Sequence, residues 1–517
     1  MPHRRCQYRC QCQFWGQFWG QFWGQYRCQY RCQFQFQYRC QFWGQFWGQF
    51  WGQCQCQFWG QHSGNRWRDR PPNHRGPGMS NDFRPDLHSE KEPYLHSPAG
   101  TRQPLSPDLL ERWVPVAEEV YRRHMTGSLP YPLTSYAPPG RQFLGSDPFG
   151  IDRQGVNFTS GDHLNLSGHP RVIAAAAAAL DQFGPYGAGT LDRTGRSATA
   201  MALEAEIAAF AGFAQASLFP SGWNAGFAVV RTLVRQGDHV VAAAGLQGGS
   251  AEGMAASGAR IHRLRGTGPE TAARHIADLR SGDANAGILL LVESLSGRDS
   301  SSTDLAMLQQ LCHRYCATLL VDVTSDFGAT GASGRGALDL QQMAGSVDVV
   351  VGDLSRVFAA NGGFVASNHL ALCCALRHGP ATCAMAPLPP QQVAAAAEAL
   401  AIVASGEGAL RRARLMANIV HLRDALTRAG LPPLGVAGPM VPVAAGSALT
   451  APRLTVALQK SGAFALLAEP PNLAAGQSLW QFQVRTDHTP DDIDCLIRAL
   501  RDLSPRPDFP TTRFDPP

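Results

Sequence analysis

Lysine is almost absent from this chain of 517 residues. Of its 45 basic residues only Lys91 and Lys460 are lysines, and all the others are arginines. A desolvated lysine amine can lose its proton and attack a carbonyl, whereas the arginine guanidinium stays protonated and cannot. Chemistry that needs a lysine nucleophile therefore has two candidates. Lys91 lies in the N-terminal lead, and Lys460 lies in a helix pattern where we expect a solvated side chain.

The chain also lacks the signals of a membrane or secreted protein. Its strongest apolar run, residues 174–180, is far too short to cross a bilayer. The start of the chain is arginine-rich and then polar-aromatic, which does not match a signal peptide. We therefore expect no signal peptide, no membrane partner and a cytoplasmic location.

Cysteine is present, but not in a pattern that binds metal or forms a disulfide framework. Eight of the fourteen cysteines lie in the first 78 residues, and the other six have no zinc spacing. This usage favours a reduced protein without a metal site. Cys312 and Cys316 lie one helical turn apart, and we expect both thiols to face the core.

The excess of positive charge belongs to the same N-terminal stretch. Residues 1–78 contain ten arginines and one aspartate, so the rest of the chain is mildly acidic although the whole carries a net charge of +5. An acidic remainder does not favour nucleic acid as a partner of the folded part.

Residues 7–60 consist of short units that begin with glutamine, such as QYRC and QFWG. They contain no valine, isoleucine or leucine to build a core, so we expect disorder. One interpretation is a translated DNA repeat upstream of a true start at Met79. The other is a low-complexity segment that binds a partner, such as RNA, through arginine and aromatic side chains. We favour the first.

From residue 130 onward, short apolar runs alternate with helical patterns. The runs are AGFAQASLF, DHVVAAA, AGILLLVES, ATLLVDV, SVDVVVGDL and GFVAS. Apolar strands separated by helices predict an α/β fold with a mostly parallel sheet covered on both faces. Ligands of such sheets bind beyond the carboxyl ends of the strands.

After about residue 390 the pattern becomes helix-rich, and HTPDDIDCLIRAL begins with a capping box of Thr489 and Asp492. These changes predict a second, smaller α+β domain. The predicted divisions are the repeat, an N-terminal helical lead, a large domain, a small C-terminal domain and a tail, at residues 1–78, 79–155, 156–390, 391–505 and 506–517.

Six segments occur in a fixed order: NFTSGDHLNLSGHPRVI, FPSGWNAG, VDVTSDFG, DLSRVFAANGG, EPPNLAAG and HTPDDID. In order and spacing they resemble the motifs of the α-oxoamine synthases. The resemblance implies a fold-type-I, pyridoxal-phosphate-dependent transferase over about residues 156–503. It also implies a dimer with active sites at the subunit interface. The family's activity is condensation of an amino acid with an acyl-CoA thioester.

The resemblance assigns cofactor positions to several residues, some of which keep the expected chemistry. Ser221, Gly222 and Trp223 follow a strand and should open a helix whose amides suit a phosphate, although a plain turn is the alternative. Asp322 ends a strand where the family has the partner of the pyridine nitrogen. Arg485 could bind the substrate carboxylate, but an ion-paired or solvated arginine is the interpretation we favour.

Other positions depart from the family pattern. Gln247 stands where the family has a histidine that stacks on the cofactor, and Ser325 replaces the histidine of the DEAH-type motif. Asp353 replaces a phosphate-binding threonine, and its carboxylate would repel a phosphate. Ser355 keeps the serine that precedes the family's lysine.

Arg356 stands at the position of that lysine, which forms the imine with the cofactor. Because arginine cannot form it, the resemblance implies pyridoxal phosphate bound non-covalently at most. Three hypotheses follow. The chain is an inactive scaffold, paired with itself or with an active paralogue, as serine palmitoyltransferase pairs a lysine-bearing subunit with one that lacks it. Alternatively it is an active acyltransferase, or its pocket binds another anion through Arg356 and Arg485. We favour the first.

Overall fold

A computed structural model describes residues 107–506 and 509, apart from residues 188, 244, 265–267, 471, 472, 474 and 475. The glutamine-rich repeat, Met79, Lys91 and nearly all of the predicted tail lie outside the described residues.

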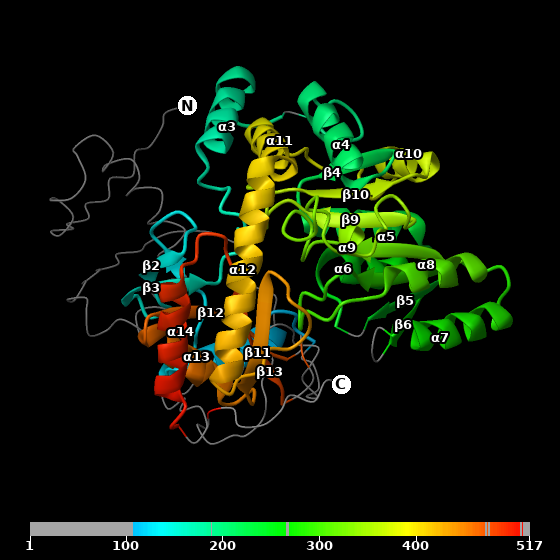
Figure 1. Ribbon diagram of the computed structural model, residues 1–517. Helices are drawn as coiled ribbons and strands as arrows, with labels where there is room; N and C mark the ends of the chain where they lie inside the picture. Colours follow the sequence, from blue (N-terminus) through cyan, green and yellow to red (C-terminus); the bar gives the residue numbers. More distant parts are fainter. Residues whose placement is uncertain are drawn as a thin grey trace, which may run out of the picture. The chain divides into compact units, whose positions relative to one another are not determined.

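The larger of two sheets has seven strands, in the order β4, β10, β9, β8, β7, β5, β6 (Figure 1). Their bounds are β4 Gln215–Phe219, β5 His239–Ala243, β6 Arg260–Leu264, β7 Ile288–Glu293, β8 Thr318–Asp322, β9 Val349–Asp353 and β10 Gly363–Ser367. Only β10 runs antiparallel to its neighbours. Each strand contains residues of a predicted apolar run except β6, which no run indicated. The prediction of a mostly parallel sheet is confirmed.

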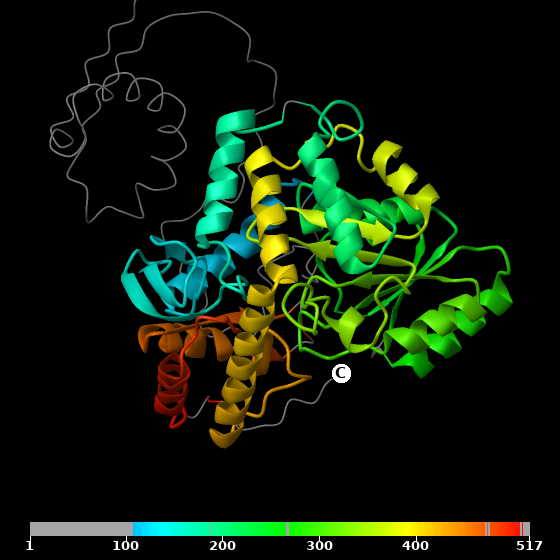
Figure 2. The same ribbon diagram turned by 45° about the horizontal axis from the view of Figure 1, so that its top comes forward.

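Helices cover both faces of this sheet, which explains why its strands are apolar throughout. In β7, Leu290 packs into the core on one face while Leu289 and Leu291 pack on the other. The helices of the large sheet are α4 Ala198–Ala211, α5 Gly222–Leu233, α6 Gly248–Ser257, α7 Pro269–Gly282, α8 Leu305–Arg314, α9 Ala337–Leu340 and α10 Leu370–His378. Helices α5, α6 and α10 supply one face, and α4, α7 and α8 the other (Figure 2).

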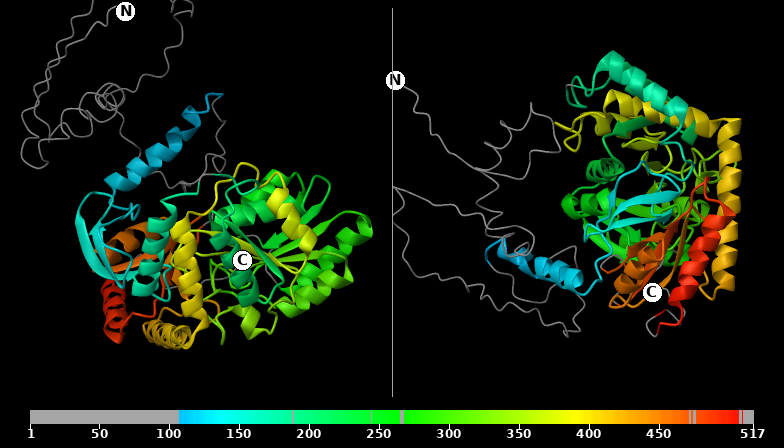
Figure 3. Two further views of the ribbon diagram at one scale, coloured as in Figure 1. Left: turned by 90° about the horizontal axis from the view of Figure 1, so that it is seen from above. Right: turned by 90° about the vertical axis from the view of Figure 1, so that its left-hand side faces the viewer.

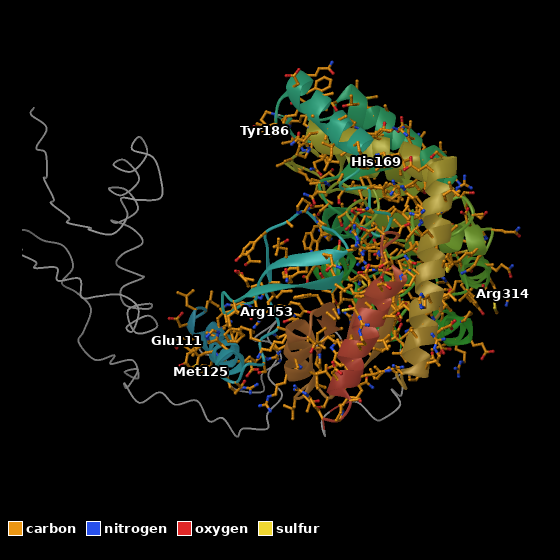
Figure 4. The ribbon with its side chains drawn as sticks, turned by 60° about the vertical axis from the view of Figure 1, so that its left-hand side comes forward. Glu111, Met125, Arg153, His169, Tyr186 and Arg314 are labelled. Atoms are coloured by element: carbon orange, nitrogen blue, oxygen red, sulfur yellow. The ribbon has the colours of Figure 1, made fainter. Side chains whose placement is uncertain are left out.

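Three helices border the large sheet: α3 Pro170–Phe183, α11 Pro390–Ala404 and α12 Gly406–Arg428. Helix α11 packs against α3 and α4, while α12 packs against α14 and β11. Figure 4 shows α3 on the outside of the molecule between the labelled His169 and Tyr186. No single helix within the described residues has the length and apolarity to cross a bilayer. The pair α11 and α12 passes that test together, with a bend of 77° between them.

The smaller sheet has six strands, in the order β1, β2, β3, β12, β13, β11 (Figure 3). The elements here are the 3-10 helix Glu111–Trp113, α2 Val114–Met125, β1 Thr134–Ser135, β2 Gln142–Ser146, β3 Asp152–Phe158, β11 Met440–Gly446, α13 Ala451–Lys460, β12 Ala463–Ala468, β13 Ser478–Gln483 and α14 Pro490–Leu503. Strand β3 pairs in parallel with β12, through Val156 and Ala463. The predicted boundary at residue 156 therefore falls inside a strand of the smaller sheet.

Two local predictions have different outcomes. The capping box at the start of α14 is present, because Thr489 accepts from the Asp492 amide and Asp492 accepts from the Thr489 amide. Cys312 is buried as predicted, but Cys316 is exposed, so that half of the prediction is wrong. Helix α8 ends at Arg314, and Cys316 adopts a left-handed backbone conformation beyond it.

Candidate functional site

Three carboxylates mark the carboxyl edge of the large sheet. Glu293, Asp322 and Asp353 are the last residues of β7, β8 and β9, three neighbouring parallel strands. Glu293 and Asp322 are register partners. Burial, followed by repulsion from Asp322, raises the pKa of Glu293 to about 7. Sequence reasoning missed Glu293, although it ends an apolar run in the same way as Asp322.

Asp322 lies within this row of carboxylates. Burial raises its pKa most, hydrogen bonds from Thr324 oppose that shift, and Asp353 adds to it. The Thr324 amide donates to Asp322 Oδ1 at 2.9 Å. The positive charge of Arg356 lowers the pKa of Asp322, as the last and smallest of these effects. The structure therefore brings Asp322, Asp353 and Arg356 together.

The predicted helix opening at Ser221 is confirmed. Ser221 is the N-cap of α5, and its Oγ accepts from the Asn224 amide at 3.1 Å. The carboxylate of Asp353 lies against the first residue of this helix. A Cβ placed on Gly222 would lie 2.6 Å from Asp353 Oδ2. Asp353 Oδ1 also accepts from the Ser355 amide at 2.5 Å. Ser221, Gly222, Asp353 and Ser355 thus form one end of the site.

Arg356 lies in the segment that follows β9 and is half-buried. Its guanidinium makes no hydrogen bond or ion pair with any residue that the structure describes. Its carbonyl oxygen accepts from the His163 amide at 3.2 Å. Its Cγ lies 3.5 Å from a Cβ placed on Gly161. Arg356 is therefore held through its backbone and side-chain stem, while its charged group is uncommitted.

His163, which sequence reasoning did not single out, lies behind Arg356. The side chain is 1% exposed, and its Nδ1 lies 2.7 Å from the Val484 carbonyl oxygen. Its Nε2 is buried and has no hydrogen-bond partner among the described residues. Burial lowers the pKa of His163 to about 3 against the effect of that hydrogen bond, and the charge of Arg356 lowers it further. The imidazole is therefore neutral at ordinary pH.

Arg485 is not a free substrate-binding cation in this structure. Its side chain is fully buried, and Nε donates to Asp487 at 2.9 Å. Nη2 donates to Asn165 Oδ1 at 2.7 Å, and Nη1 donates to Ser160 Oγ at 3.2 Å. Nη1 also forms an ion pair with Asp162 at 3.6 Å. The ion-paired alternative describes Arg485 correctly.

The remaining predicted positions line the same edge. Trp223 is 47% exposed and stacks on Phe227 at 5.4 Å between ring centroids. Gln247 is the exposed N-cap of α6, without a side-chain capping bond. The start of α6 lies against that of α5, since a Cβ placed on Gly249 would meet the Trp223 carbonyl. Ser325 Oγ lies 3.2 Å from a Cβ placed on Gly297, whose amide donates to Glu293.

An apolar cleft of about 650 Å³ lies elsewhere, between α3, α4 and α11. It contains none of the residues predicted from the sequence. Its polar lining residues are Thr199, Glu206 and Glu398, and burial raises the pKa of Glu206. The clustered ionisable groups identify the strand edge, not this cleft, as the candidate site.

A mostly parallel sheet between helices, a smaller second sheet and a site at the strand ends define a fold-type-I transferase of the pyridoxal-phosphate superfamily. The model of the family "Aminotransferase class I and II" matches residues 153–500. The chain belongs to this family and, within it, to the α-oxoamine synthases.

Relatives and solved structures agree with this assignment. The 8-amino-7-oxononanoate synthase of Salmonella arizonae is 30% identical over 348 residues, which cover 67% of this chain and 89% of that enzyme. The serine palmitoyltransferase structure from Sphingomonas wittichii has a TM-score of 0.71 at 25% identity, covering 77% of this chain and 98% of that one. An 8-amino-7-oxononanoate synthase structure from Francisella tularensis has a TM-score of 0.57 at 22% identity, covering 68% and 98%.

The residues at the site fit covalently bound pyridoxal phosphate poorly. Asp322 keeps the acid expected beside a ring nitrogen. At the other end, the Asp353 carboxylate lies against Gly222, where a phosphate would need the helix amides. Arg356 offers no amine that can form an imine. The residues at the site therefore fit neither the covalent link to the cofactor nor the binding of its phosphate.

Proposed function

We propose that this chain is a catalytically inactive α-oxoamine synthase homologue that acts as a scaffold or as the partner of an active subunit. The observation that carries the proposal is Arg356, which follows β9 at the position of the family's lysine. Its guanidinium stays protonated and its nitrogen lone pairs are delocalised, so it cannot attack an aldehyde.

Lys460, the one lysine among the residues that the structure describes, offers no replacement. Lys460 is exposed at the C-terminal end of α13, a helix that packs on β12 of the smaller sheet. Lys91 lies outside the described residues. A nucleophilic lysine needs a desolvated position that lowers its pKa, which an exposed side chain does not have.

The surroundings of Arg356 support the same proposal. Gln247 has no aromatic face to stack on a cofactor ring. Arg485 uses its donors within the protein. Asp322 alone would not create an electron sink without a ring to act on. Pyridoxal phosphate, if offered, would therefore bind weakly and without a covalent bond.

The partner in this proposal is a second copy of the chain or an active paralogue. The six described cysteines are free thiols, which fits a reducing, cytoplasmic setting. Co-expression with an active α-oxoamine synthase of the same host, followed by native mass measurement, distinguishes a homodimer from a mixed dimer. A strictly monomeric chain under both conditions would contradict the scaffold proposal.

The alternative is a pyridoxal-phosphate-dependent acyltransferase that condenses an amino acid with an acyl-CoA. Family membership favours it, so turnover is the direct test. We expect the purified chain to release no coenzyme A from a panel of acyl-CoA thioesters and amino acids, with the relative from Salmonella as positive control. Release above background would establish the alternative.

Restoring the lysine alone should not restore this activity. In Arg356→Lys the amine returns, but Asp353 still opposes the phosphate and Gln247 still lacks a stacking face. We expect coenzyme A release by this variant to stay at background. Appreciable release would mean that Arg356 is the only obstacle to catalysis.

A further inference from the structure

The start of α5 faces a carboxylate supplied by the chain itself. Asp353 ends β9, and its Oδ2 lies 2.6 Å from the position of a Cβ on Gly222. Any side chain at position 222 would collide with this carboxylate. The position of the Asp353 carboxylate therefore requires a glycine at position 222.

The helix end at this point is suited to an anion. Ser221 satisfies the Asn224 amide, but the amides of Gly222 and Trp223 make no hydrogen bond to another described residue. Free amides and the helix dipole give the start of a helix a partial positive charge. The Ser355 amide holds the other oxygen of Asp353, which fixes the carboxylate in place.

We propose that the Asp353 carboxylate, fixed beside the start of α5, makes this site select against phosphate-bearing molecules. A phosphate at the start of α5 would displace or closely approach a fixed carboxylate, with Asp322 adding negative charge nearby. The half-buried Arg356 offsets part of the charge of Asp322. The site therefore favours the unphosphorylated form of a pyridine aldehyde over the phosphorylated form.

Removing the charge of the Asp353 side chain tests this proposal. Purified wild type, Asp353→Asn and Asp353→Thr are compared in equilibrium dialysis with three probes: pyridoxal phosphate, pyridoxal and inorganic phosphate. Asp304→Asn is the matched control, since Asp304, like Asp353, accepts from a backbone amide, that of Met307 at the start of α8 at 2.9 Å, and lies outside the candidate site. Urea denaturation shows that each variant is folded.

We expect wild type and Asp304→Asn to bind pyridoxal phosphate no more tightly than pyridoxal. In Asp353→Asn and Asp353→Thr the preference for the phosphorylated probe should rise at least tenfold, because one full charge is removed at contact distance. A wild type that already prefers pyridoxal phosphate tenfold, or folded variants without any gain in preference, would overturn the proposal. Neither result requires turnover, so the outcome is independent of whether the chain is an active synthase.

Discussion

Two regions of this molecule carry family motifs, and they differ in how their polar groups are satisfied. In residues 485–492 the buried polar side chains have partners inside the protein: Arg485 is ion-paired, and both nitrogens of His488 are hydrogen-bonded. At the carboxyl edge of the large sheet, burial and a neighbouring carboxylate raise the pKa of Glu293 and of Asp322, and the Arg356 guanidinium has no hydrogen bond among the described residues. These contacts hold the first region together, whereas the second keeps the strand-end carboxylates of the candidate site and has Arg356 at the lysine position.

The largest difference should appear when the two arginines are compared. Arg485→Met leaves the buried Asp162 and the half-buried Asp487 without their countercharge, so we expect a loss of about 3–5 kcal/mol in the free energy of unfolding. Arg356→Met, the matched variant, should change it by less than about 1 kcal/mol, since an uncommitted guanidinium is lost. Urea denaturation measures both. Equal losses in the two variants would remove the distinction between the regions.

A smaller effect, of opposite sign, is expected at Glu293. Its folded-state pKa of about 7 lies above the ordinary 4.5, so the folded chain loses stability as pH rises from about 4.5 to 7, and the loss is complete above pH 7. Glu293→Gln should therefore be more stable than wild type by about 3 kcal/mol at pH 8.5. This advantage should shrink as pH falls through 7 and vanish below about 4.5, where the wild-type side chain is neutral in both states.

The control for this prediction is Glu252→Gln, on the exposed surface of α6. Its difference from wild type should stay flat over the same pH range. Denaturation midpoints measured at half-unit pH intervals make the comparison. A Glu293→Gln variant with no pH-dependent advantage would show that the strand-end carboxylates do not disturb one another.

The smallest effect is expected at the capping box of α14. Thr489→Ala removes the acceptor for the Asp492 amide and should cost about 1 kcal/mol. Thr427→Ala is the control, because its hydroxyl only donates to the Arg423 carbonyl within α12. Thermal denaturation should show a lower midpoint temperature for Thr489→Ala than for Thr427→Ala. A loss at Thr427 as large as that at Thr489 would argue against a specific role of the cap.

Much of the fold could be predicted because its signals are local. Continuous apolar runs predict buried parallel strands, and Thr489 with Asp492 predicts the start of α14. The pairing of β3 with β12 could not be predicted, since it joins segments about 300 residues apart. Nothing in the sequence of either strand indicates which strand it pairs with. The surface position of Cys316 depends on where α8 ends, a boundary that helical spacing does not fix.

The site was predictable to a similar degree and for similar reasons. Asp322, Asp353 and Arg356 stand in recognisable motifs, and the structure brings them together. An ion-paired Arg485 was among the favoured interpretations, but its partners could not be predicted, because Asp162 and Asn165 come from a loop after β3 that only tertiary folding brings near. His163 gave no signal of its own, since a single histidine within a motif does not indicate burial.

The most direct test of this account is reduction of the purified chain with borohydride in the presence of pyridoxal phosphate, followed by peptide mass spectrometry. The account predicts no pyridoxyl adduct on any residue, while the Salmonella relative treated in parallel carries one. A stoichiometric adduct on Lys460 or Lys91 would contradict it, because a working imine would then exist without a lysine at position 356.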